Sequence, residues 1–203
     1  MLASLKYSLT HLFDFKGRDA RQTFWYYAFF VLAIYFIAWI IAIVPVIGSA
    51  MSGAMKAAQQ GLPQEQVSAE VMRGMGPGLA SIAWFSIIAS LLFTLLLVAA
   101  FARRLHDSGH SGWWAGLVLL IKIGVLIPSV RAIGHLDEAL EAASQAMQNA
   151  SDPAAMQQLQ AGQDPMQAAI GLVGWIGPII MIVFGVMKST DGPNRYGETS
   201  VTF

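Results

Sequence analysis

The stretch that decides the fold runs from Phe24 to Val44 and reads FWYYAFFVLAIYFIAWIIAIV. It contains no charged residue, and the next charge along the chain is Lys56. About 20 mostly apolar residues in a helix cross the roughly 30 Å hydrocarbon core of a bilayer. Because backbone amides in lipid must be satisfied within the segment, we predict a transmembrane helix. A signal peptide is the alternative, but signal h-regions span only about 7–15 residues, so we interpret the run as an uncleaved anchor.

Three further apolar runs have the length of a span, at about residues 79–102, 113–130 and 168–187. They alternate with outer connections at about 45–78 and 131–167, in which apolar residues recur with helical period. Long unbroken apolar runs differ from the short alternating strands of a membrane barrel. We therefore predict an all-α integral membrane four-helix bundle, with residues 1–203 forming a single membrane domain and with helical outer loops.

The composition agrees with a membrane location. Hydrophobic residues make up 56% of the chain and charged residues 12%, and the mean hydropathy is +0.56. A soluble domain typically carries about 25% charged residues. The formal net charge of +0 gives no general attraction to nucleic acid, so we expect no nucleic-acid partner. The absence of Cys excludes disulfides, thiolate metal sites and Cys nucleophiles.

The distribution of Lys and Arg predicts the orientation, because short cytoplasmic loops are enriched in them. With both termini in the cytoplasm, the inner side holds Lys6, Lys16, Arg18, Arg21, Arg103, Arg104, Lys188 and Arg195. The outer side then holds only Lys56, Arg73 and Arg131. At the N-terminus, Leu2, Leu5, Leu9, Leu12 and Phe13 fall at helical spacing. This spacing predicts a short amphipathic helix on the inner leaflet.

Three polar clusters lie at the expected cytoplasmic face. Residues 15–25 read FKGRDARQTFW, residues 103–114 read RRLHDSGHSGWW, and residues 191–197 read DGPNRYG. A four-helix bundle brings such chain segments close together, so one composite site is available.

The patterns F-x-G-R-x-x-R-x-x-F-W, R-x-x-H-D-x-G-x-S-G-W-W and G-P-N-x-Y-G, in this order among four spans, resemble a known family. It is that of the YhaH-like bacterial inner-membrane proteins, or domain of unknown function 805. The resemblance covers about Phe13 to Gly197, although the outer connections are longer than is usual there. It implies a bacterial plasma-membrane location and the topology above, and it implies no activity.

The arginines of these clusters favour two interpretations. Guanidinium groups bind phosphate and carboxylate bidentately, so Arg18, Arg21, Arg103 and Arg104 are candidates for binding an anionic lipid headgroup or phosphate at the inner leaflet. Alternatively, Asp19 and Asp107 pair with them in an internal salt-bridge lock. The candidate site also includes His106, Asp107, Asn194, Arg195 and Tyr196. We expect Asn194 and Tyr196 to hydrogen-bond to the arginine loop beneath the bundle.

An enzymatic interpretation rests on His106 and Asp107 as an acid–base pair. The signal is weak, because adjacent side chains usually point in different directions and no third ligand follows at helical spacing. We therefore expect no catalytic residue, no metal site and no cofactor.

Polar residues inside the spans support one more hypothesis. Lys122 lies near mid-depth of the third span, where a charge is costly and marks a functional site by default. Ser86, Ser90 and Thr94 repeat every fourth residue along the second span, which is also typical of close helix packing. The leading prediction is a non-enzymatic accessory or interaction protein, with a protein partner or a homo-oligomer left open. The alternatives are a small transporter or channel using Lys122 and the serine–threonine face, and a membrane enzyme.

Overall fold

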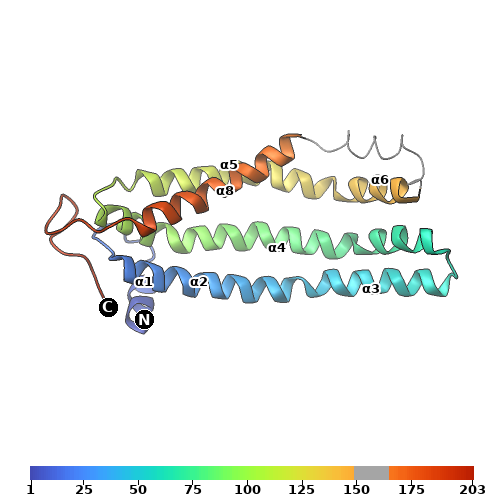
Figure 1. Ribbon diagram of the computed structural model, residues 1–203, viewed down its shortest axis with the longest axis horizontal. Helices are drawn as coiled ribbons and strands as arrows, with labels where there is room; N and C mark the ends of the chain where they lie inside the picture. Colours follow the sequence, from blue (N-terminus) through green and yellow to red (C-terminus); the bar gives the residue numbers. More distant parts are fainter. Residues whose placement is uncertain (149–164) are drawn as a thin grey trace. The chain divides into compact units, whose positions relative to one another are not determined.

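The structure, a computed structural model, describes residues 1–148 and 165–203, and its regular secondary structure is helical. The helices are α1 (Leu2–Thr10), α2 (Arg21–Ala42), α3 (Val44–Gln59), α4 (Gln64–Asp107), α5 (Trp113–Gly134), α6 (Leu136–Gln148) and α8 (Pro165–Val186) (Figure 1). Within the described residues, extended pairing is limited to two isolated bridges, between Asp19 and Val201 and between Asn194 and Gly197. The predicted all-α class is confirmed.

In the described part of the chain, four helical segments are long and apolar enough to cross a membrane, as expected of the predicted integral membrane protein. They lie within Arg21–Gln59, Gln66–Asp107, Trp113–Gly134 and Ala169–Val186. Each contains one of the apolar runs identified in the sequence. A long apolar stretch thus predicts a membrane-spanning helix from local sequence alone, because the hydrocarbon core requires apolar side chains and internally satisfied backbone amides.

The second span does not begin where its apolar run begins. α4 is one continuous helix from Gln64 through Pro77 to Asp107, so the expected outer connection 45–78 consists of α3, a short turn and the first part of α4. A proline inside a helix removes a hydrogen bond and costs about 3 kcal/mol. Beside Pro77, α3 approaches α4 closely, because a Cβ atom on Gly78 would lie 2.6 Å from the Cα of Val46. Of the second outer connection, residues 149–164 lie outside the described part.

The helices divide into two compact units. Unit 1 contains residues 1–37, 89–126 and 171–203, and unit 2 contains 38–88 together with the described part of 127–170. Unit 1 therefore includes α1, the first parts of α2 and α5, and the last parts of α4 and α8. All three polar clusters belong to unit 1.

The N-terminal helix α1 is amphipathic, but its inward face is partly polar. Ser4, Leu5 and Ser8 are buried, whereas Leu2 and Leu9 are exposed. The exposed leucines continue into Phe13, which is 89% exposed. This distribution fits a helix whose serine face packs on the protein and whose outer face meets lipid.

The core of unit 1 is built from aromatic and small side chains. Phe24 and Tyr27 of α2 pack with Phe101 and Leu105 of α4, and all four are almost completely buried. The hydroxyl of Tyr27 donates to the carbonyl oxygen of Leu96 at 3.0 Å, so this buried polar group is satisfied. In lipid, such close packing and hydrogen bonding hold helices together, since burial from water contributes little there.

In unit 2, glycines bring α3 and α4 into backbone contact. A Cβ atom placed on Gly74 would lie 2.9 Å from the Cα of Gly53. A Cβ atom on Gly78 would lie 2.6 Å from the Cα of Val46 and 2.8 Å from the carbonyl oxygen of Pro45. Backbone atoms cannot move aside as a flexible side chain does, so these positions require glycine.

We predict that Gly78→Ala lowers the free energy of unfolding by about 1–3 kcal/mol, because the added methyl group overpacks the contact between α3 and α4. Thermal unfolding in detergent measures this. The control is Gly48→Ala, at which a Cβ atom meets nothing within 4 Å. That substitution should leave the midpoint unchanged or slightly raised, since Ala favours helix over Gly. Equal midpoints for the two variants would contradict the contact.

Candidate functional site

Five charged residues form a buried cluster at the end of unit 1 that carries the termini. They are Arg18, Asp19, Arg103, Arg104 and Asp107, here called the ionic lock, and each is at most 2% exposed. Arg103 pairs with Asp19 at 3.0 Å, and Asp107 pairs with both Arg18 and Arg104. Burying charges in this way is expensive unless each is paired and hydrogen-bonded.

Asp107 is the centre of the lock. Its carboxylate accepts hydrogen bonds from Arg18 Nε at 3.3 Å and from Arg104 Nη1 at 2.5 Å, and a further one from the hydroxyl of Ser200. Its backbone carbonyl oxygen accepts from the amide and the hydroxyl of Thr190 at 2.8 and 2.9 Å. One residue at the end of α4 thus connects α4 to the segment before α2 and to the C-terminal tail.

The arginines donate to backbone carbonyls just after α1 and at the end of α8. Arg104 donates to Gly185 O at 3.2 Å and to Met187 O, at the end of α8. Arg103 donates to His11 O at 2.8 Å and to Asp14 O at 2.5 Å, just after α1. The last four carbonyls of a helix have no partner inside the helix. A guanidinium has five donors in a rigid fork and can serve several of them at once.

Arg18 holds the C-terminal tail in the same way. It donates to Thr190 O at 2.8 Å, Gly192 O at 2.7 Å and Gly197 O at 3.2 Å. The tail then returns to the chain before α2, where Val201 N donates to the backbone oxygen of Arg18 at 2.9 Å. The tail is therefore part of the folded unit.

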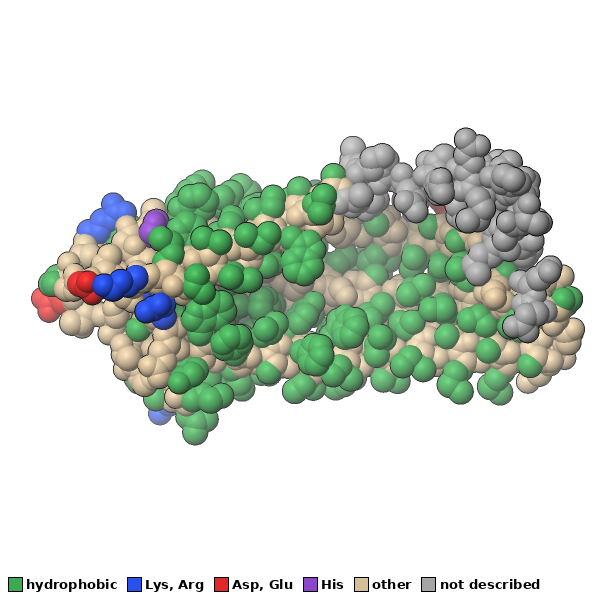
Figure 2. Space-filling model, in the orientation of Figure 1, with side chains coloured by type: hydrophobic (Ala, Val, Ile, Leu, Met, Phe, Trp, Pro, Cys, Tyr) green, Lys and Arg blue, Asp and Glu red, His purple; other side chains and the backbone are tan. Residues whose placement is uncertain are grey.

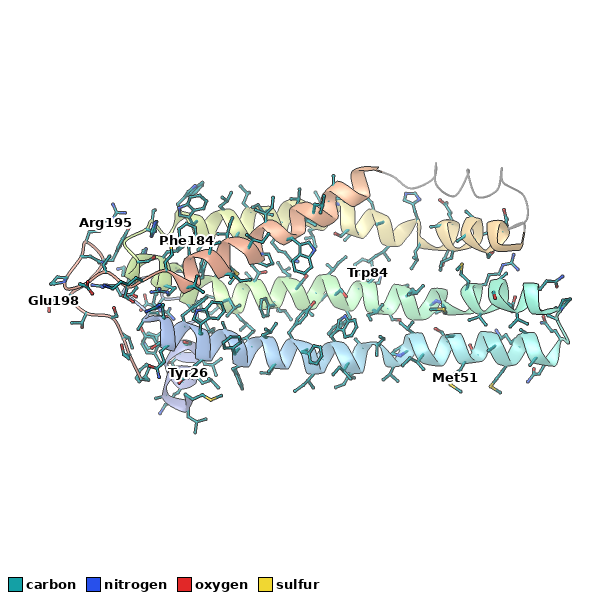
Figure 3. The ribbon with its side chains drawn as sticks, in the orientation of Figure 1. Tyr26, Met51, Trp84, Phe184, Arg195 and Glu198 are labelled. Atoms are coloured by element: carbon teal, nitrogen blue, oxygen red, sulfur yellow. The ribbon has the colours of Figure 1, made fainter. Side chains whose placement is uncertain are left out.

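The predicted hydrogen bond of Asn194 to the arginine loop is present, whereas Tyr196 contacts the loop by ring stacking instead of the predicted hydrogen bond. Asn194 Nδ2 donates to His106 O at 2.9 Å, and the ring of Tyr196 stacks on that of His106 with centroids 3.9 Å apart. Arg195 between them is exposed and lies over the Tyr196 ring at 4.6 Å. Figure 3 shows Arg195 and Glu198 on the loop formed by the tail.

Asp19 is the least well satisfied member of the lock. Burial raises the pKa of its carboxyl to about 6, although the adjacent Arg103 opposes the shift. Within the described residues, Asp19 Oδ1 and Arg103 Nη2 have no hydrogen-bond partner. Both observations indicate that the ion pair with Arg103 compensates only part of the desolvation of Asp19.

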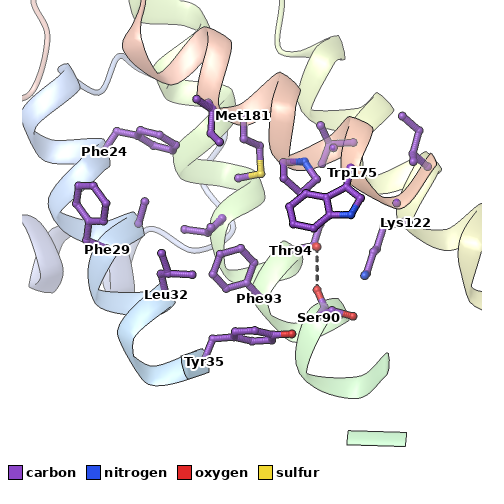
Figure 4. A pocket seen from close by; sticks show the side chains of 18 of the residues that line it. Phe24, Phe29, Leu32, Tyr35, Ser90, Phe93, Thr94, Lys122, Trp175 and Met181 are labelled. Carbon is purple, nitrogen blue, oxygen red and sulfur yellow. Dashed lines mark hydrogen bonds between the residues drawn. The ribbon is translucent and has the colours of Figure 1, made fainter. Parts of the chain in front are cut away.

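A second feature of unit 1 is a cavity of about 660 Å³ among the helices. Residues of α2, α4, α5 and α8 line it, as Figure 4 shows. Most of the lining is apolar, including Phe29, Leu32, Phe93, Trp175 and Met181. The volume lies in the range of about 300–1,000 Å³ that is common for pockets of small ligands.

The polar groups of this cavity include the ones predicted from the spans. Lys122, Ser90 and Thr94 line it together with Tyr35, and the lining contains no acidic residue. The hydroxyl of Thr94 donates to Ser90 O at 2.9 Å. Ser86 does not line the cavity, and its hydroxyl donates to Ile82 O at 2.7 Å along its own helix. Lys122 is the one lining residue that can carry a charge in the middle of a span.

A sequence profile of a protein family of unknown function, DUF805, matches residues 12–198. The chain belongs to the DUF805 family. No curated protein and no solved structure matches the chain. The family match includes both the ionic lock and the cavity, so both lie within the family's domain.

In this DUF805 protein, the candidate anion-binding arginines occupy two different environments. Arg18, Arg103 and Arg104 are buried and have protein partners, whereas Arg21 is exposed. Figure 2 shows exposed basic and acidic side chains at this end of unit 1 and an apolar flank along its helices. Anion binding by the arginines stays a prediction, but the geometry of the lock is that of the internal alternative. Residues that the sequence analysis missed are Thr190 and Ser200, because their role depends on how the tail folds back.

The hypothetical acid–base pair of an enzyme does not face the cavity. The carboxylate of Asp107 is occupied by two arginines and Ser200. His106 stacks on Tyr196, and its Nδ1 lies 3.3 Å from Gly17 O. A Cβ atom on Gly112 would lie 2.9 Å from Nε2 of the same ring. In the described part of the chain, no group of three or more His, Cys, Asp or Glu residues is placed to hold a metal ion.

We predict that Asp107→Asn lowers the free energy of unfolding by about 3–5 kcal/mol, because it leaves two buried guanidinium groups without their counter-charge. Thermal unfolding in detergent is the measurement. Asp191→Asn is the matched control, since Asp191 pairs with Lys188 on the surface and both side chains are exposed. Surface pairs contribute little, so this control should unfold like the wild type. Similar destabilisation by both substitutions would contradict a special role of the lock.

We also predict a pH dependence that comes from Asp19. Burial raises its pKa from the ordinary value of 3.8 to about 6 in the folded protein, so the folded state binds the proton more tightly than the unfolded chain does. The resulting stabilisation is fully present below about pH 4 and is lost as the pH rises through 6. The unfolding midpoint of the wild type, relative to that of Asp19→Asn, should therefore rise as the pH is lowered from 7 to 4. A difference that stays constant over this range would show that Asp19 does not titrate there.

Proposed function

We propose that this protein is a non-enzymatic membrane protein that binds a lipid-soluble molecule in the cavity of unit 1. The observation that carries the proposal is an apolar cavity with a few polar groups among membrane-spanning helices. Binding sites for small molecules have this combination, in which apolar walls provide contact area and polar groups fix orientation.

The cavity opens to the surroundings of the helices, since Phe29, Leu32 and Trp175 of its lining are 58%, 47% and 66% exposed. Here Phe24, Leu97 and Val118 belong both to the tightly packed core and to the cavity lining. The helices thus pack closely on one side of this layer and leave a space on the other. An apolar space among membrane-spanning helices is suited to a lipid or a lipid-soluble ligand.

The proposal includes a location. We place the protein in the inner membrane of a bacterium, with both termini in the cytoplasm, because Lys and Arg are concentrated on that side of the chain. In this orientation the exposed Leu2, Leu9 and Phe13 at and after α1 meet the inner leaflet. Anionic lipid headgroups there would find the exposed Arg21 rather than the buried arginines.

A small transporter is the second candidate, since Lys122, Ser90 and Thr94 share the cavity. Transport begins with binding, so the same site serves both functions. Flux of the bound molecule through proteoliposomes separates them, because an accessory protein that only binds produces no flux.

We predict that a bound lipid-soluble molecule is lost from the variant Gly174→Phe. Gly174 lines the cavity, and a Cβ atom there meets nothing within 4 Å, so a phenylalanine ring can enter the space without backbone strain. The measurement is mass spectrometry of molecules extracted from purified protein after thorough detergent exchange.

The matched control is Gly171→Phe, one turn earlier on α8. Gly171 is also unhindered, is exposed and does not line the cavity. The control should retain the bound molecule, and both variants should unfold at similar temperatures. If the wild type carries no molecule above the detergent background, or if both variants lose it equally, the proposed binding site is wrong.

A further inference from the structure

The polar groups of the cavity lie at one end of it. Along α2 the lining runs from Phe24, near the ionic lock, to Tyr35. This is a distance of roughly 16 Å at 1.5 Å per residue. Ser90 and Lys122 lie at the same far end, as the antiparallel course of α4 and the position along α5 require. Figure 4 shows the side chain of Lys122 extending toward the end at which Ser90 and Tyr35 lie.

The end nearer the lock is apolar. It is formed by Phe24, Phe29, Leu97 and Met181, with Trp25 beside them. The indole nitrogen of Trp25 donates to Gly185 O at 3.0 Å, so its polar atom is already used outside the cavity. The cavity therefore has an apolar end toward the membrane surface and a polar end near the middle of the membrane.

This polarity is opposite to that of a phospholipid in the same leaflet. A phospholipid places its headgroup at the surface and its chains toward the midplane. Its headgroup would here meet Phe24 and Met181, and its chain ends would meet Lys122. The cavity instead fits a molecule whose polar group reaches mid-depth while its chain extends toward the lock.

The charge of Lys122 defines the polar group. A lone ammonium in hydrocarbon is costly, and buried charges normally have a partner of opposite sign. The cavity lining offers none, and the salt bridges of the described residues do not include Lys122. A carboxylate on the ligand would supply the missing charge through a short charge-assisted hydrogen bond.

We infer that the cavity binds a single-chain carboxylic acid, with its carboxylate on Lys122 and its chain between α2, α4 and α8. The inference rests on the proposed function, because it specifies the ligand of the same cavity. In this inference, Lys122 is the counter-ion of the ligand's carboxylate, which explains why a charged residue occurs in an apolar span.

Oleic acid is the probe. We measure its equilibrium binding to the purified protein in detergent, with radiolabelled ligand and immobilised protein, for the wild type, Lys122→Met and Lys122→Arg. Lys122→Met removes the charge-assisted hydrogen bond and should weaken binding by about tenfold or more. Lys122→Arg keeps the charge and should retain most of the affinity. The control Lys188→Met removes an exposed lysine and should bind like the wild type.

Oleyl alcohol, which has the same chain without the carboxylate, separates the two proposals. It should bind more weakly than oleic acid to the wild type and equally to the wild type and Lys122→Met. If both probes bind alike, are unaffected by Lys122→Met and are blocked by Gly174→Phe, the carboxylate assignment is overturned while the cavity remains a binding site. An uncharged quinone should displace oleic acid more easily from Lys122→Met than from the wild type, because oleic acid is held less tightly in the variant. Equal displacement from both would overturn the assignment of the carboxylate to Lys122. If neither probe binds the wild type, the assignment and the proposed function fall together.

Discussion

The burial of the Asp107 carboxylate between two guanidinium groups is the interaction on which the rest of unit 1 depends. An ion pair of this kind adds little net stability compared with a well-packed apolar core, since desolvation consumes most of the attraction. Its value lies in specificity, because buried charges accept only arrangements in which every partner is present. Arg18 and Arg104 can pair with Asp107 only when the chain before α2, the end of α4 and the tail meet at one place.

The lock also explains how lipid-embedded helices obtain a defined arrangement. Apolar side chains gain little free energy when they move from lipid into the protein interior. Burial alone therefore does not favour one packing arrangement of apolar helices over another. The arginines of the lock bind backbone carbonyls after α1 and at the end of α8, which fixes those ends against α4. A close-packed layer containing Phe24 and Leu97 follows, and the cavity opens beyond it. The order along unit 1 is thus lock, packed layer and cavity.

The sequence predicts the parts of this arrangement that depend on local physics. Each span is visible as an apolar run because the lipid environment acts on every residue of it. Arg18 and Arg21 lie three residues apart in the same basic segment, yet one is buried with three tail carbonyls and the other is exposed, and that difference arises only when the tail folds back. The continuity of α4 through Pro77 likewise depends on the glycine contacts with α3, which no pattern within α4 reveals.

Lys122 shows how a residue gains meaning from its surroundings. In the sequence it is a charged residue within an apolar span. A position of the helix that brings Lys122 nearer the membrane surface would explain the charge equally well. The structure places it on a cavity whose walls carry no acidic residue and whose apolar end lies toward the lock. A lysine that served only to anchor the helix at the membrane surface beside the lock would extend toward the lock. Its side chain extends instead toward Ser90 and Tyr35, at the other end of the cavity. A role in binding the polar group of a ligand explains this direction.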